Sequence, residues 1–125
     1  MTIQDAIATA DEMKANMVSP RLKYKYLTEI EQLVHGEIVM KHEHTAAQET
    51  KPVYTEETDK LTELIIPDPY SMLYVYWLLT KIDMQNQEDG RYNVDRAHFE
   101  NAWDTMSDWY TRSHMPIQRT REFLL

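Results

Sequence analysis

The chain has 125 residues, 42% of them hydrophobic, no cysteine and a formal net charge of −8 at pH 7. This length fits one domain with a sizeable core, and the lack of cysteine excludes a disulfide scaffold, a thiol nucleophile and a cysteine-ligated zinc site. The acidic balance argues against a nucleic-acid-binding face, and two glycines are too few for a phosphate-cradling loop or a dinucleotide fingerprint. We expect no signal peptide, and no apolar run approaches the roughly 20 residues that span a bilayer.

The first third of the sequence predicts two helices. Thr2 is followed three residues later by Asp5, a capping-box-like start, and apolar residues then recur at steps of three and four over residues 2–16. Ser19-Pro20 has the signature of an N-cap followed by a first-turn proline, and a second apolar stripe extends over residues 20–42. Because the connection between these helices is short, we expect them to pack as antiparallel neighbours.

Residues 43–66 lack helical periodicity and are strongly polar. Between residues 43 and 63, six acidic side chains stand against two lysines. A connection of about 20 residues without secondary structure is uncommon inside a compact domain and is often mobile or functional. We therefore interpret residues 43–66 as a mobile polar arm, with strand signals at residues 53–55 and 64–66 that would pair as a hairpin.

The second half of the sequence predicts two further helices. Asp68 and Pro69 again combine an N-cap with a first-turn proline, and the apolar residues that follow predict a third helix over residues 69–88. Gly90 and the polar run around it are expected to break this helix, and Asn93 is the expected cap of a fourth. The short connection predicts that the third and fourth helices are antiparallel neighbours.

Together these elements predict an all-α fold. We expect a single helical domain over residues 1–116, a small bundle of about four helices whose last helix ends before Pro116, because the residue preceding a proline disfavours helical geometry. A long polar loop or hairpin arm joins the second and third helices in this interpretation. Residues 117–125 then form an extended C-terminal tail.

The third predicted helix is apolar nearly all the way round, so two opposite sides of it must be buried against other protein surface. At 100° per residue one side suits the core of the domain and carries Tyr70, Leu73, Tyr74, Trp77 and Leu78. The opposite side carries Met72, Val75, Tyr76 and Leu79. Either the helix is central and its own chain buries it on all sides, or the second side meets another copy of the chain, since four such side chains exposed together would be unfavourable.

His42, Glu43 and His44, with His35 two turns earlier, invite a metal-binding interpretation, because imidazole and carboxylate bind divalent metals. On a helix, however, His42 and His44 point away from each other, and no further ligand has a defined place. We therefore expect solvated polar residues here, with no metal and no cofactor.

Glu37 lies between Ile30 and Met40 on the apolar face of the second predicted helix. A buried carboxylate needs a cation or hydrogen-bond donors, so we predict that Glu37 is a buried structural carboxylate with Arg91, Arg96 or a tyrosine hydroxyl as its partner. The aromatic residues at helical spacing are expected in the core, and the serines lie in no nucleophile motif. Without a catalytic constellation, we expect that the protein is not an enzyme.

Three stretches in a fixed order carry a resemblance to a known family. They are "YLTEIEQLVHGEIVMKHE", then, after a variable polar arm, "YTEETDKLTELIIPDPYSMLYVYWLLTKIDMQNQEDGRYN", and finally "FENAWDTMSDWYTRSHMP". In this order and spacing the chain resembles small head–tail connector proteins, also called adaptor or head-completion proteins, of tailed phages of Gram-positive bacteria. The resemblance covers residues 22–116.

The resemblance implies a structural virion protein at the head–tail junction of a phage or prophage. Such a subunit is all-helical and forms a homo-oligomeric ring below the portal, dodecameric in the assembled particle, which extends the DNA channel and joins capsid to tail. Its implied partners are the portal protein and the next connector, stopper or tail protein, while DNA passes without tight binding. The chain would be made in the cytoplasm of the bacterial host, and no membrane would be involved.

Two sets of residues are then candidates for contacts in the assembled particle. The expected interface between subunits is the second side of the third helix, with Met72, Val75, Tyr76 and Leu79. In such families a C-terminal segment typically grips the portal, and the candidates for a docking tail here are Arg112, Arg119, Arg121, Phe123 and Leu124. Basic residues followed by an apolar tip fit a segment that orders on binding, and an ordinary frayed terminus is the alternative.

Two other classes stay open. A small acidic soluble regulator or inhibitor would bind a basic protein partner or mimic DNA, with residues 43–63 as an acidic bait. A neighbouring stopper or tail-completion protein would be richer in strand, so a fold with little helix would favour that class.

Overall fold

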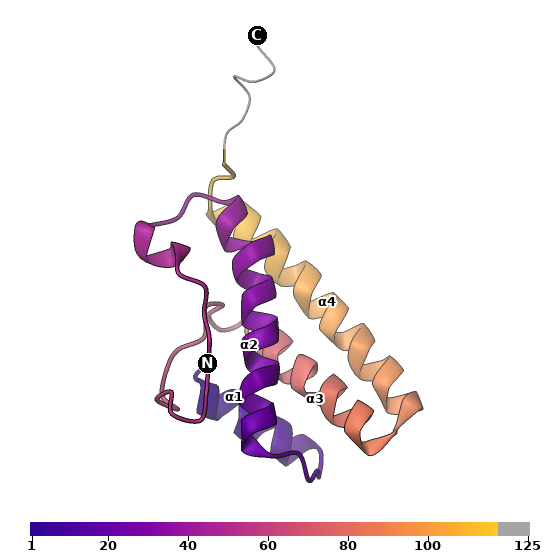
Figure 1. Cartoon of the computed structure of the whole chain (residues 1–125). Helices are drawn as coiled ribbons and strands as arrows, with labels where there is room; N and C mark the ends of the chain where they lie inside the picture. The colour runs from indigo at the N-terminus through magenta and orange to yellow at the C-terminus, as the bar shows by residue number, and fades with distance from the viewer. Residues whose placement is uncertain (118–125) are drawn as a thin grey trace.

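The computed structural model describes residues 1–117 and places them in four α-helices and two short 3₁₀-helices (Figure 1). These are α1 (Ile3–Met13), α2 (Pro20–Glu37), η1 (Val39–Lys41), η2 (Ala46–Glu49), α3 (Met72–Asn86) and α4 (Asp89–Ser113). The described residues contain two isolated bridges, Thr2 with Glu63 and His42 with Pro116, but no strand. The all-α prediction is therefore confirmed, and the hairpin predicted within residues 53–66 does not form.

The first two helices begin where their capping residues predict. The Thr2 hydroxyl accepts a hydrogen bond from the Asp5 amide at 3.1 Å, and the Asp5 carboxylate accepts one from the Thr2 amide at 3.2 Å, which completes a capping box. The Ser19 hydroxyl accepts from the Leu22 amide at 3.3 Å, with Pro20 in the first turn of α2. Both caps depend only on local sequence, which is why the pattern predicts them.

The starts of α3 and α4 differ from the prediction. Pro69 follows a cis peptide bond and lies in a turn before α3, while the Asp68 carboxylate accepts a hydrogen bond from the Ser71 hydroxyl instead of capping backbone amides. Gly90 does not break a helix, because it lies in the first turn of α4. The chain reverses at Gln87, which adopts the left-handed conformation (φ 58°) usual for a residue that ends a helix.

α3 is the central helix of the bundle. It packs against α1, α2 and α4, and α4 returns alongside it (Figure 1). The predicted pairing of the third and fourth helices is confirmed, whereas α1 packs mainly on α3 and only slightly on α2. The buried residues of α1 are Ile3, Ala6 and Ala10, and the two alanines allow a close approach of neighbouring backbone.

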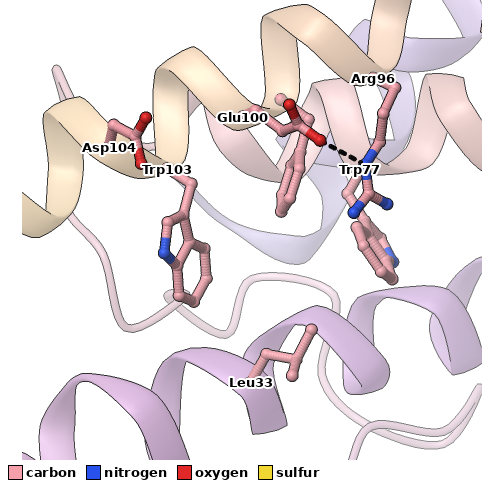
Figure 2. Close-up of a pocket in the computed structure, with 7 residues that line it drawn as sticks. Leu33, Trp77, Arg96, Glu100, Trp103 and Asp104 are labelled. Carbon is pink, nitrogen blue, oxygen red and sulfur yellow. Dashed lines mark hydrogen bonds and ion pairs between the residues drawn. The ribbon is translucent and has the colours of Figure 1, made fainter. Parts of the chain in front are cut away.

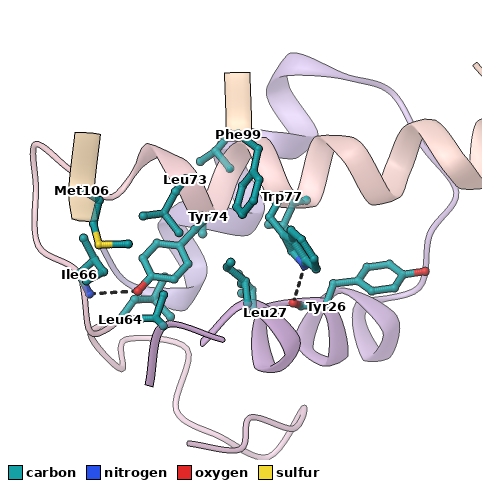
Figure 3. Close-up of a cluster of buried hydrophobic side chains, with 14 of the residues drawn as sticks. Tyr26, Leu27, Leu64, Ile66, Leu73, Tyr74, Trp77, Phe99 and Met106 are labelled. Carbon is teal, nitrogen blue, oxygen red and sulfur yellow. Dashed lines mark hydrogen bonds between the residues drawn. The ribbon is translucent and has the colours of Figure 1, made fainter. Parts of the chain in front are cut away.

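The hydrophobic core gathers around the aromatic residues of α3 (Figure 3). The Tyr74 hydroxyl accepts a hydrogen bond from the Ile66 amide at 3.0 Å, and the Trp77 indole donates to the Tyr26 carbonyl at 3.0 Å. Satisfied polar tips let these large rings be buried without a lost hydrogen bond. Other members of this core are Leu27, Leu64, Ile66, Leu73, Phe99 and Met106.

The polar segment 43–66, predicted as a mobile arm, runs along α2 with specific contacts (Figure 1). The Gln32 amide donates to the Pro52 carbonyl at 3.1 Å, and His35 Nε2 lies 2.8 Å from the Gln48 carbonyl. Its far end is tied to the N-terminus, because the Ile3 amide donates to the Thr62 carbonyl at 3.0 Å. Two helices thus hold a segment that has little regular structure of its own.

Candidate functional site

The second side of α3 is largely covered within the single chain. Val75 and Leu79 are 0% and 2% exposed. At 100° per residue they share a side with Asn86, whose amide donates to the Ala15 carbonyl just after α1, at 3.3 Å. α1 therefore covers this side, and neither Val75 nor Leu79 offers surface to a second copy.

Met72 and Tyr76 are half-buried and lie beside a shallow groove between α3 and α4. The Tyr76 ring stacks on His98 with 5.2 Å between ring centroids. This α3–α4 groove has a volume of about 240 Å³ and is lined by Tyr70, Met72, Tyr76, His98, Ala102 and Thr105, among others. Two of the four residues predicted at a subunit interface thus meet at one place on the surface.

A second groove lies between α2 and α4, with a volume of about 300 Å³ (Figure 2). Trp103 points from α4 toward Leu33 on α2, and Leu33 is 43% exposed. Arg96 donates to Glu100 at 3.2 Å along the α4 wall, and its guanidinium carbon lies 5.6 Å from the centre of the Phe99 ring. We call this the α2–α4 groove; its lining is Leu33, Trp77, Arg96, Phe99, Glu100, Trp103 and Asp104.

The buried structural carboxylate is Glu31, and the prediction that it is Glu37 is wrong. Glu31 is 0% exposed and accepts hydrogen bonds from the Tyr74 hydroxyl (2.5 Å), the Tyr54 hydroxyl (2.7 Å) and the Ile65 amide (3.0 Å). Glu37 is exposed in the last turn of α2, where its carboxylate pairs with Lys41 at 2.8 Å. α2 ends at Glu37, and the side chain is 57% exposed at this end of the helix.

Burial raises the pKa of Glu31 above its ordinary value, although hydrogen bonds from Tyr74, the Ile65 amide and Tyr54 lower it part of the way. Burial and the adjacent Glu31 charge also raise the pKa of Tyr74 and of Tyr54, so both phenols stay protonated donors. The network joins α2, α3 and segment 43–66, and its role is structural.

A second polar cluster, which the sequence did not reveal, lies where the end of α1 meets α3 and α4. The Lys14 ammonium donates to Asp83 and, at 2.8 Å, to Asp95, with Glu88 at 3.9 Å. Asp83 is 0% exposed, and its Oδ2 has no hydrogen-bond partner among residues 1–117. Burial raises the pKa of Asp83 to about 6, assisted by the nearby Asp95 carboxylate and opposed by Lys14.

In the other two members of the cluster, Lys14 and Asp95, the pKa shifts favour the charged form. Burial disfavours the charged forms of Lys14 and Asp95, but their mutual hydrogen bond and those with Asp83 outweigh it, so the pKa of Lys14 is raised and that of Asp95 is lowered. One cation thus bridges two carboxylates on different helices. Nothing in the spacing of residues 14, 83 and 95 predicts that they meet.

The predicted docking tail lies mostly beyond the described structure. Arg112 is exposed in the last turn of α4, where a cation complements the helix dipole. Arg119, Arg121, Phe123 and Leu124 fall outside residues 1–117. The last described residues are held next to η1, since the Ile117 amide donates to the Lys41 carbonyl at 3.1 Å.

The histidines considered as metal ligands make other contacts. His42 donates from Nδ1 to the Ile38 carbonyl at 2.7 Å and meets the Tyr110 ring edge-on at 5.0 Å, while His44 Nε2 lies 3.4 Å from Glu49. Within residues 1–117, no three His, Asp or Glu side chains are grouped so that they could hold a metal ion. In the same range, no helix is long and apolar enough to cross a membrane.

Comparison of the chain with protein-family models, with curated proteins and with solved structures gives no match. The features of the chain that bear on its function are therefore its residues, the sequence resemblance and the two grooves that flank α4.

Proposed function

We propose that the chain is a head–tail connector, or adaptor, subunit of a tailed phage or prophage. In this proposal copies form a ring below the portal, extend the DNA channel and join the capsid to the tail. The observation that carries the proposal is the ordered resemblance of three stretches across residues 22–116. The all-α fold is of the kind that this resemblance implies.

The surface of α4 supports a ring. In a closed ring each subunit contacts two neighbours through two different surfaces. The α3–α4 groove and the α2–α4 groove open on different sides of α4 and have different linings. Met72 and Tyr76 in the first groove are now the interface candidates, because Val75 and Leu79 are buried.

The charge of the chain supports passage of DNA without tight binding. The net charge is −8, and the acidic side chains of segment 43–66 are exposed: Glu43, Glu49, Glu56, Glu57, Asp59 and Glu63. Anionic walls have little affinity for phosphates, so a channel made from such subunits would not retain DNA.

The test is co-assembly with the portal protein of the phage or prophage that, in this proposal, encodes the chain. The proposal expects the mixture to form a complex much larger than either component in sedimentation velocity, and expects loss of that complex when residues after Pro116 are removed. A matched control is Leu61→Arg, which changes a side chain of segment 43–66 that is 62% exposed and lies in neither groove. A complex that forms equally well without the tail refutes tail docking, and no complex in any form refutes the connector proposal.

The alternative is an acidic regulator that binds a basic protein. Six exposed carboxylates against two lysines along one segment favour it, because an excess of negative charge attracts a cationic partner. This alternative predicts a small particle that ignores the portal and binds a cationic protein with strong salt dependence. The same sedimentation experiment distinguishes the two proposals.

A further inference from the structure

The α2–α4 groove is an open, partly apolar surface between two helices, and the last described residues lie beyond the C-terminal ends of both. Leu33 is 43% exposed and Trp103 is half-buried, and both face the groove (Figure 2). Leu33 and the Trp103 indole face each other across open space and expose apolar surface to water. An apolar side chain placed between them would bury this surface. The groove therefore has room and chemistry for one or two apolar side chains.

The charges of the groove differ between its two ends. Toward the start of α4, Arg96 and Glu100 neutralise each other. Toward the end of α4, Asp104 has no ion-pair partner among residues 1–117, whereas Glu37, which lies one helical turn after Leu33 and outside the groove lining, is neutralised by Lys41 at 2.8 Å. The end nearer the C-terminus of α4 is thus acidic, and apolar surface follows it.

The chain leaves the described structure at this acidic end. The Ile117 amide is bound to the Lys41 carbonyl, and the Met115 carbonyl accepts from the Glu43 amide at 2.7 Å. Leu33 precedes Lys41 by eight residues, which form the last turn of α2 and then η1 and span about 12–16 Å at 1.5–2.0 Å per residue. Position 123 follows Ile117 by six residues, which span up to about 20 Å when extended, so the chain is long enough to turn back into the groove.

We propose that the α2–α4 groove is the docking site for residues 119–124 of the same chain. In this proposal the basic residues Arg119 and Arg121 lie near Asp104, the unpaired carboxylate of the groove, and Phe123 and Leu124 pack between Leu33 and Trp103. The order of the tail, basic and then apolar, matches the order of the groove counted from Ile117. This docking concerns the free chain and does not depend on the connector proposal.

The test replaces Phe123 of the full chain with the photo-crosslinking residue p-benzoylphenylalanine. After irradiation at low protein concentration, the proposal expects crosslinks within one chain to the peptides that carry Leu33 or Trp103. Leu33→Arg should lower their yield about tenfold, which corresponds to roughly 1.4 kcal/mol, while Leu61→Arg outside the groove should leave it unchanged. Circular dichroism checks that both variants remain helical.

A charge exchange provides a second measurement if Leu33→Arg does not fold. Asp104→Arg should lower the same crosslinks, and adding Arg119→Asp and Arg121→Asp should restore them. Crosslinks elsewhere, or a yield that neither Leu33→Arg nor Asp104→Arg changes, overturn the proposal. Covalent dimers in place of crosslinked monomers also overturn it, because they assign the groove to the tail of a second copy.

Discussion

Replacement of Glu31 by alanine should destabilise the fold more than replacement of any exposed carboxylate. Glu31 is fully buried and accepts three hydrogen bonds, from Tyr74, Tyr54 and the Ile65 amide. Breaking a buried charged network costs about 3–5 kcal/mol, and each buried donor left unpaired costs about 1–3 kcal/mol. Of these three donors, only the Tyr74 hydroxyl belongs to a residue that is 0% exposed, so it is the least able to bind water in place of Glu31. We expect Glu31→Ala to lower the free energy of unfolding by about 3–5 kcal/mol, a large part of the ~5–15 kcal/mol typical of a domain.

The assay is urea denaturation followed by circular dichroism at pH 7, with Glu37→Ala as the matched control in the same helix. Glu37 is exposed and loses only a surface pair with Lys41, so its replacement should change the free energy of unfolding by less than about 0.5 kcal/mol. A double-mutant cycle of Glu31→Ala with Tyr74→Phe should show coupling of about 1–3 kcal/mol. If Glu31→Ala and Glu37→Ala cost the same, the assignment of Glu31 as the buried carboxylate is refuted.

Three further predictions concern single positions. The pKa of Asp83 is about 6 in the folded state, above its ordinary value of 3.8, so the folded state binds a proton on the Asp83 carboxyl more tightly than the unfolded state does. The stability that comes from this bound proton is lost as the pH rises from about 4 to about 6. The lowered pKa of Asp95 changes stability in the opposite direction, but only below about pH 4. The urea midpoint of Asp83→Asn should therefore fall less than that of the wild type between pH 4 and 6. Equal falls of the urea midpoint in both proteins would contradict this. Gly36 lies in α2 with open space around it, so Gly36→Ala should raise the free energy of unfolding by about 0.5–1 kcal/mol, and a loss would show an unseen constraint. Gln87→Gly should be neutral or stabilising by a few tenths to about 1 kcal/mol in the same assay, because glycine suits a φ of 58°, whereas Gln87→Val should destabilise; equal effects would contradict the left-handed assignment.

Local chemistry made part of the fold predictable. The caps at Thr2 and Ser19 involve partners three residues away, and the sequence placed both correctly. The same reasoning misplaced the start of α3, because Asp68 bonds a side chain, Ser71, and Pro69 lies in the preceding turn. A cap motif therefore predicts a helix nearby, but not its first residue.

Contacts between residues far apart in the sequence determine which side chains are buried, and the sequence pattern did not predict these contacts. Glu31 and Glu37 both lie on α2, but only Glu31 is covered, by Tyr74 of α3 and by Tyr54 and Ile65 from a segment without periodicity. The apolar circumference of α3 was predicted correctly, but the alternative of a central helix accounts for Val75, which α1 covers. Lys14 and Asp83 meet across 69 positions of sequence, and no pattern in the chain indicates that contact.

The connector proposal is tested most directly by electron microscopy of portal particles prepared with and without this chain. The proposal predicts a collar of additional density below the portal that follows the symmetry of the ring and disappears when the chain is omitted. Portal particles that look the same in both preparations, at concentrations where the chain is in excess, would contradict it.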